Sequence, residues 1–141
     1  MKAKYVTTEL ERNDAFFIRK TVFVEEQGIP IQDEFDQYED VANHIVIYNN
    51  EEPVGAGRLR IVDNVAKLER ICVLASYRKY GVGKLIVTTM EDLGKEKGMT
   101  KAMLHGQTQA EHFYKKLGYH TITEPFMEDG IPHVIMVKEL L

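Results

Sequence analysis

The stretch of residues 68–84 changes character twice, and this constrains the fold more than any other part of the chain. Residues 65–74 are mostly apolar or β-branched, which is typical of a short buried strand. Basic and glycine residues follow, in the order Arg78-Lys79-Tyr80-Gly81-Val82-Gly83-Lys84. Apolar residues at helical spacing then begin, at Leu85, Ile86, Met90 and Leu93. The pattern predicts a strand, a turn and a helix in direct succession.

A turn of this composition at the start of a helix predicts an anion site. The first N–H groups of a helix have no partner within the helix, and the helix dipole places partial positive charge at the same end. Gly81 and Gly83 carry no Cβ atom that would keep a pyrophosphate away from the backbone. Arg78, Lys79 and Lys84 add positive charge.

Two common phosphate-binding motifs do not fit these residues. Residues 81–86 lack the third glycine of the dinucleotide fingerprint. Lys84 is followed by Leu85, and Arg78 stands where a Walker loop has its first glycine. The pattern that remains, Arg-x-x-Gly-x-Gly, is short, and an ordinary strand-to-helix turn with solvated basic residues can also produce it.

Together with three further segments, this pattern resembles the GNAT acetyltransferases, and in particular the small bacterial YjcF/ElaA-like branch. The family signature for acetyl-CoA is Arg/Gln-x-x-Gly-x-Gly/Ala after a bulged strand, which Arg78, Gly81 and Gly83 match. The other matching segments are residues 68–73 (LERICV), 110–119 (AEHFYKKLGY) and 22–27 (VFVEEQ), with Gly-Ile-Pro-His at 130–133. The resemblance covers nearly the whole chain.

The resemblance implies an α+β fold, a mixed and mostly antiparallel central sheet flanked by helices on both faces. It also implies transfer of acetyl from acetyl-CoA to an amine by direct attack in a ternary complex. The backbone of Ile71, Cys72 and Val73 would hold the pantetheine, with the N–H of Val73 donating to the thioester oxygen. The cofactor-binding set implied by the match is completed by Arg78, Lys79, Tyr80, Gly81, Val82, Gly83, Lys84, Gln107 and Tyr114.

Two of the implied roles compete with structural explanations. Tyr114 matches the tyrosine that protonates the departing CoA thiolate, but it also belongs to an apolar helical stripe with Ala110, Phe113 and Leu117. Gln107 matches the Asn/Gln that helps to hold pantetheine, and it could instead cap a helix or form a turn.

The general base is the least determined role. Glu69 matches the base proposed in some family members, while others carry their glutamate two residues earlier, where this chain has Lys67. Water relayed to Glu69 or to a backbone carbonyl is an alternative, as is an exposed carboxylate paired with Lys67 or Arg70. His133 is either an acceptor contact or a structural histidine at a strand end.

The sequence leaves more than one class of function open. The first is an N-acetyltransferase for a small-molecule or peptide amine. The second is a CoA-binding or interaction module of the same fold with little or no turnover. A nucleotide-phosphate binder that uses the same loop is less favoured, because the two phosphate motifs fail.

Length and composition limit the remaining possibilities. A chain of 141 residues predicts a single domain over residues 1–141. Cys72 is the only cysteine and lies in an apolar strand, which favours a core residue over a nucleophile. The histidine spacing indicates no metal site. A net charge of −4 with scattered Lys and Arg argues against nucleic-acid binding, and the absence of a signal peptide or membrane span predicts a cytoplasmic location.

Residues 21–40 concentrate negative charge. This segment has seven acids and no Lys or Arg. Such runs usually form a solvated face. In the resembled fold, however, the segment borders the acceptor site, where a field of this sign would attract a cationic amine.

The remaining elements are predicted from local patterns. We expect a strand at residues 2–7, a helix starting at Asn13-Asp14, and an antiparallel meander of strands at 44–48, 53–61 and 65–74. The helix after the glycine loop should end at Gly98. A strand at 101–105, a helix from Ala110 and a final strand pair at 119–123 and 133–138, around a loop at 124–130, complete the chain.

Overall fold

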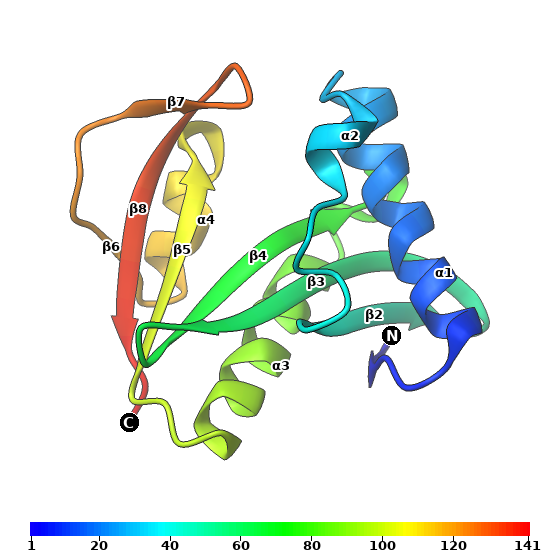
Figure 1. The fold of residues 1–141 in the computed structure, drawn as a ribbon, viewed down its shortest axis with the longest axis horizontal. Helices are drawn as coiled ribbons and strands as arrows, with labels where there is room; N and C mark the ends of the chain where they lie inside the picture. Colours follow the sequence, from blue (N-terminus) through cyan, green and yellow to red (C-terminus); the bar gives the residue numbers. More distant parts are fainter.

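The computed structural model describes residues 1–141 as one mixed sheet with helices on both faces (Figure 1). The strand order is β1-β2-β3-β4-β5-β8-β6, with β7 paired to β8, and every pair is antiparallel except β4 with β5. The strands are β1 (Lys2–Tyr5), β2 (Asn43–Asn49), β3 (Glu52–Val62), β4 (Val65–Val73), β5 (Lys101–Gln107), β6 (His120–Thr121), β7 (Phe126–Glu128) and β8 (Ile131–Glu139). The α+β class, the mostly antiparallel sheet and the meander are confirmed.

Helical segments connect the strands and cover the sheet. They are α1 (Glu9–Arg19), a π-helical segment η1 (Lys20–Glu26), α2 (Ile31–Glu34), the 3₁₀ turn η2 (Ala75–Tyr77), α3 (Val82–Glu96), the 3₁₀ turn η3 (Thr108–Ala110) and α4 (Glu111–Lys116). None of these helices has the length and hydrophobicity that crossing a bilayer would require.

The first helix begins earlier than the sequence pattern predicted. Thr8 is its N-cap: its hydroxyl accepts a hydrogen bond from the N–H of Glu11, and Glu11 accepts one from the N–H of Thr8. This is a capping box, which satisfies two N–H groups that the helix leaves free. The predicted start at Asn13-Asp14 is therefore wrong, because a stronger start signal lies one turn earlier.

Alternate residues of the central strands face two separate cores. Ile45 and Ile47 pack on the side of α3, whereas Val46 packs on the side of α1. The glycines of β3 are required by this packing: a Cβ atom at Gly57 would lie 2.7 Å from Ile86, and one at Gly55 would lie 2.8 Å from Val82. Both glycines let α3 approach the sheet closely, so their role is structural.

The sheet opens between β4 and β5. These strands pair only where residues 66–68 meet residues 102–104, and beyond that point they diverge (Figure 1). Arg70, where β4 leaves its partner, has φ +57, and the β3–β4 register shifts beside it. Such a bulge bends and twists a strand. It therefore helps to turn the end of β4 away from β5.

The last part of the chain differs from the prediction. The expected loop at 124–130 contains β7, whose Phe126 pairs with His133 of β8, and the expected strand at 119–123 is reduced to the two residues of β6. Asp129 and Gly130 both have positive φ, as a tight hairpin turn between β7 and β8 requires. The hairpin brings Glu128 and His133 to the opening of the sheet.

Candidate active site

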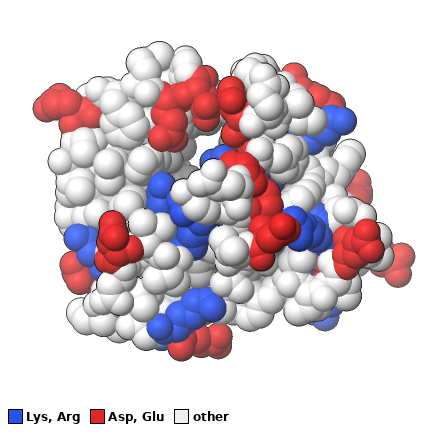
Figure 2. All heavy atoms as spheres, in the orientation of Figure 1, with Lys and Arg blue, Asp and Glu red and all other residues white.

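A cleft of about 820 Å³ occupies the opening between β4 and β5. Its walls come from η1, β3 and β4 on one side and from β5, α4, β7 and β8 on the other. Figure 2 shows the hollow, with basic groups on its floor and acidic groups along its upper rim. Of the predicted site residues, the cleft is lined by Glu69, Ile71, Cys72, Val73, Arg78, Lys79, Gly81, Gly83, Lys84, Gln107 and Tyr114.

Two predicted residues do not line the cleft with their side chains. Tyr80 is 68% exposed and lies outside it, and the side chain of Val82 is buried between α3 and β3. Val82 can still contribute its backbone N–H, because it is the first residue of α3.

The N-terminus of α3 presents free donors. Leu85 donates to the carbonyl of Gly81, while the amides of Val82, Gly83 and Lys84 have no acceptor within the protein. Gly81 is the N-cap with φ +77, and no atom lies within 4 Å of the position that a Cβ would occupy there. At Gly83, in contrast, a Cβ would lie 3.0 Å from the Phe113 ring, so this glycine serves packing. The helix end can hold an anion through its backbone.

Arg78 is engaged within the protein. It makes two hydrogen bonds to the carboxylate of Glu26, at 2.6 and 2.7 Å, and its Nε donates to the carbonyl of Val73 at 3.0 Å. These bonds tie the loop before α3 to η1 and to the end of β4. Lys79 and Lys84 are exposed beside the cleft and make no ion pair, so they are the cations available to a bound anion.

The free edge of β4 faces the cleft. Leu74 donates to the carbonyl of Val54 on β3, and successive backbone groups of a strand point to opposite sides. The N–H of Val73 is therefore directed into the opening. The carbonyl of Val73, which accepts a hydrogen bond from Arg78, points to the same side. The neighbouring Cys72 is buried, with its Sγ 3.8 Å from the carbonyl of Ala56, and burial raises the pKa of the thiol. It is a core residue and not a nucleophile.

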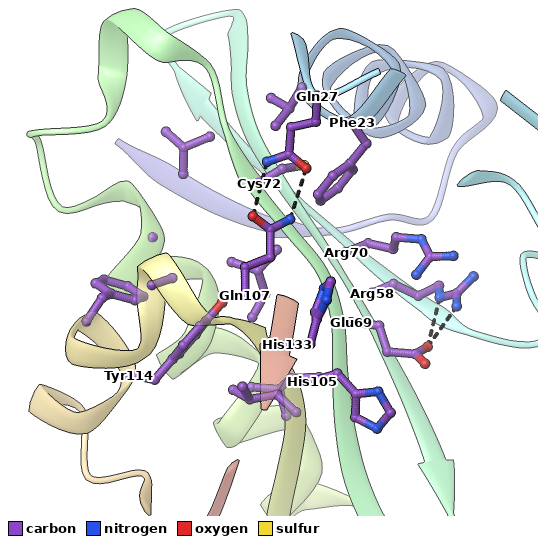
Figure 3. A pocket seen from close by; sticks show the side chains of 18 of the residues that line it. Phe23, Gln27, Arg58, Glu69, Arg70, Cys72, His105, Gln107, Tyr114 and His133 are labelled. Carbon is purple, nitrogen blue, oxygen red and sulfur yellow. Dashed lines mark hydrogen bonds and ion pairs between the residues drawn. The ribbon is translucent and has the colours of Figure 1, made fainter. Parts of the chain in front are cut away.

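Tyr114 reaches the cleft from α4. The side chain is 8% exposed, and its hydroxyl has no hydrogen-bond partner within the protein. Figure 3 shows the ring lying across the cleft wall with its oxygen directed inward. Gly106 leaves room for the ring, since a Cβ there would lie 3.2 Å from it. Burial raises the pKa of Tyr114 above its ordinary value, so the phenol stays protonated at neutral pH.

Gln107 spans the cleft. Its amide nitrogen donates to the side-chain oxygen of Gln27 at 2.9 Å, and the Gln27 nitrogen lies 3.4 Å from the Gln107 oxygen (Figure 3). This pair joins the residue that follows η1 to the end of β5. Gln107 therefore already has a polar partner. A ligand that runs along β4 and bonds to Gln107 would have to replace Gln27 as that partner.

Glu69 is held by three cations. Arg58 and Arg60 donate to its carboxylate at 3.0 and 2.8 Å, and Lys67 lies at 3.2 Å. Burial alone would raise the pKa of Glu69, but the hydrogen bond from Arg60 and the charges of Arg58 and Lys67 outweigh it and lower the pKa to about 2. A carboxylate so stabilised is a weak proton acceptor at neutral pH, which argues against the base role considered for Glu69.

Arginines neutralise much of the acidic segment. Glu34 and Glu39 pair with buried Arg19, at 2.9 and 2.7 Å. Asp36 pairs with Arg58 at 2.8 Å. Arg70 also pairs with Glu34 and Asp36, and Arg58 with Glu39. Further pairs join Asp40 to Arg12 and Glu26 to Arg78. The field that this segment offers to a cationic acceptor is therefore much smaller than its sequence charge suggested.

The structure adds a cluster that sequence reasoning did not assemble. His105, Glu128 and His133 come from β5, β7 and β8 and line the same cleft. The only sequence signals were the Gly-Ile-Pro-His segment and the Asp-Gly turn before it. Neither signal reveals that β8 pairs with β5, which brings His105 to the same wall as Glu128 and His133.

Comparisons with known proteins agree with this architecture. A family model described as an acetyltransferase (GNAT) domain matches residues 17–140. The chain is 53% identical over 143 residues to the uncharacterized protein YyaT of Bacillus subtilis (strain 168), covering 99% of this chain and 97% of that one. It is 46% identical over 140 residues to the uncharacterized N-acetyltransferase YjcF of the same organism, covering 99% and 100%.

Solved structures share the fold. Escherichia coli ElaA is 24% identical, with a TM-score of 0.87 over 98% of this chain and 99% of that chain. An aminoglycoside 6'-N-acetyltransferase complexed with coenzyme A is 14% identical, with a TM-score of 0.78 over 100% and 98%. The chain belongs to the GNAT acetyltransferase family. The predicted family and its YjcF/ElaA-like branch are confirmed.

Proposed function

We propose that residues 1–141 form one GNAT domain that transfers acetyl from acetyl-CoA to an amine by direct attack in a ternary complex. The observation that carries the proposal is the convergence of three features on one cleft. These are the free amides at the start of α3, the unpaired edge of β4 and the hydroxyl of Tyr114. Family membership supports the same reaction, and a protein of the same fold is solved with coenzyme A.

The substrate acetyl-CoA fits the cleft in one direction. Its pyrophosphate would accept hydrogen bonds from the amides of Val82, Gly83 and Lys84, with the ammonium group of Lys79 nearby. Its pantetheine would run along the free edge of β4 at residues 71–73, and its amides would take the place of Gln27 as partner of Gln107. Such a path places the thioester in the opening of the sheet.

Two groups would then act on the reacting atoms. The N–H of Val73 would donate to the thioester oxygen and stabilise the negative charge that develops on it during attack. Tyr114 would protonate the departing thiolate, since its phenol is kept protonated by burial. Cys72 supports direct transfer, because its buried thiol is a poor acyl carrier.

The cofactor site is tested by a pair of matched glycine variants. Gly81 and Gly98 both have positive φ, of +77 and +84, at the two ends of α3, and neither has an atom near its Cβ position. Valine costs ~1–2 kcal/mol of backbone strain at either position. Only at Gly81 would its methyl groups occupy the proposed phosphate site.

We therefore expect Gly81→Val to weaken binding of acetyl-CoA by at least about tenfold, or ~1.4 kcal/mol, in titration calorimetry. Gly98→Val should lose similar thermal stability and bind acetyl-CoA as the wild type does. Equal affinities for the two variants would show that the α3 N-terminus is not the phosphate site.

A further inference from the structure

Three side chains on the wall formed by β5, β7 and β8 make a connected cluster. Nδ1 of His105 lies 2.9 Å from Oε1 of Glu128, and Nε2 of His133 lies 3.8 Å from Oε2 of the same carboxylate. Phe126 packs edge-on against His105 and stacks on His133. The cluster is therefore fixed by packing and hydrogen bonds, and its three members line the cleft. Figure 3 shows the two histidines on the cleft wall.

The hydrogen bonds determine which nitrogen of each ring is free. Nδ1 of His133 lies 2.7 Å from the carbonyl of Ile131, which can only accept, so Nδ1 carries the proton. The hydrogen bond with His105 lowers the pKa of Glu128, so this carboxylate is ionised and also accepts. In the neutral rings, Nε2 of both histidines therefore carries the lone pair. Both Nε2 atoms can therefore accept a proton. Glu69 is a weaker acceptor, because three cations stabilise its carboxylate.

The two histidines differ in exposure. His133 is almost fully buried at the cleft wall, whereas the side chain of His105 is 24% exposed. Oε2 of Glu128 lies close enough to Nε2 of His133 to stabilise an imidazolium there. His133 is thus placed to take a proton inside the cleft, and His105 holds the Glu128 carboxylate through its Nδ1–H.

We propose that Nε2 of His133 is the general base that deprotonates the acceptor ammonium, with Glu128 stabilising the imidazolium until the proton passes to solvent in the cleft. This rests on the proposed acetyl transfer. The freed nitrogen lone pair attacks the thioester carbon, the C–S bond breaks with its electron pair on sulfur, and Tyr114 protonates the thiolate. The second proton that the nitrogen loses returns to the Tyr114 oxygen through water, and one proton in total is released to solvent.

The test compares His133→Asn with the wild type. The asparagine amide can still donate to the carbonyl of Ile131, so the variant removes the base while it retains the local hydrogen bond. His120→Asn, at an exposed position of β6, is the matched control. The assay is release of CoA thiol from acetyl-CoA with spermidine, kanamycin, L-lysine and a lysine-containing peptide as acceptors, over a range of pH.

In the wild type, kcat/KM should rise with pH and then level off while the free acceptor is still an ammonium, because a base in the cleft removes its proton. The charged and titratable groups that line the cleft together with His133, and that can move this rise along the pH axis, include Arg60, Lys67, Glu69, His105, Glu128 and Asp129. In His133→Asn, kcat/KM at neutral pH should fall ~10²-fold. It should then keep rising tenfold per pH unit toward the pKa of the acceptor amine, because only the free amine reacts.

A second variant keeps the inference testable if His133→Asn fails to fold. Glu128→Gln changes a half-exposed side chain and removes the charge beside Nε2 of His133. The rising limb of kcat/KM should move to lower pH, with a lower plateau. Unchanged pH profiles in both variants, with an active wild type, would overturn the inference and leave the acetyl transfer standing. An inactive wild type across all four acceptors would overturn the proposed function itself.

Discussion

Replacing Tyr114 by phenylalanine is expected to lower kcat by at least roughly tenfold, within the ~10²–10⁴ that a positioned general acid typically contributes. The ring keeps its packing against Phe113 and Tyr119 and its fit over Gly106. The lost hydroxyl has no partner within the protein, so its removal leaves no unpaired group. Melting temperature and affinity for acetyl-CoA should both survive.

A second buried tyrosine provides the control. Tyr119 lies outside the cleft and donates to Glu91 at 2.7 Å. Tyr119→Phe should therefore cost about 1 kcal/mol of stability and leave kcat unchanged. If kcat measured at saturation is the same in Tyr114→Phe and the wild type, Tyr114 is not the acid.

Replacing Arg58 by leucine is expected to lower the free energy of unfolding by about 3–5 kcal/mol. Arg58 is 1% exposed and pairs with Asp36, Glu39 and Glu69 at 2.8, 3.1 and 2.9 Å. Removing its charge leaves three carboxylates close together with fewer cations to balance them. Urea unfolding at neutral pH measures the loss.

A surface ion pair of the same chemistry is the comparison. Arg12 pairs with Asp40 at 2.7 Å, where the aspartate side chain is mostly exposed to solvent. Arg12→Leu should change stability by less than about 1 kcal/mol. A similarly small loss in Arg58→Leu would mean that the buried network does not hold α1, α2 and the central strands together.

Much of the fold was predictable because it depends on local patterns. In the strands of the meander, apolar residues alternate with polar ones or form short continuous runs. In α3, apolar residues recur at helical spacing. Gly81 and Gly98 mark the ends of that helix. The loop before α3 and the position of Tyr114 on a helix follow from the same local signals, whereas the role of the β4 backbone was implied only by the family resemblance.

The structure also shows what local patterns cannot reveal. Side chains distant in the sequence decide the charge of the site: Arg58 and Arg60 on β3 engage Glu69 on β4, and Arg19 on α1 takes up Glu34 and Glu39. A charge count over residues 21–40 contains none of these pairings. The histidine cluster likewise depends on β5, β7 and β8 meeting in one sheet.

The proposed function requires this GNAT domain to transfer acetyl from acetyl-CoA to an amine in the cleft between β4 and β5. The direct measurement is steady-state release of CoA thiol by the wild type with the four amines named above, with mass spectrometry of the acceptor. We expect release that depends on the amine, with one acetyl group found on the acceptor for each thiol. Tight binding of acetyl-CoA without amine-dependent release would contradict it and leave a CoA-binding module of the same fold.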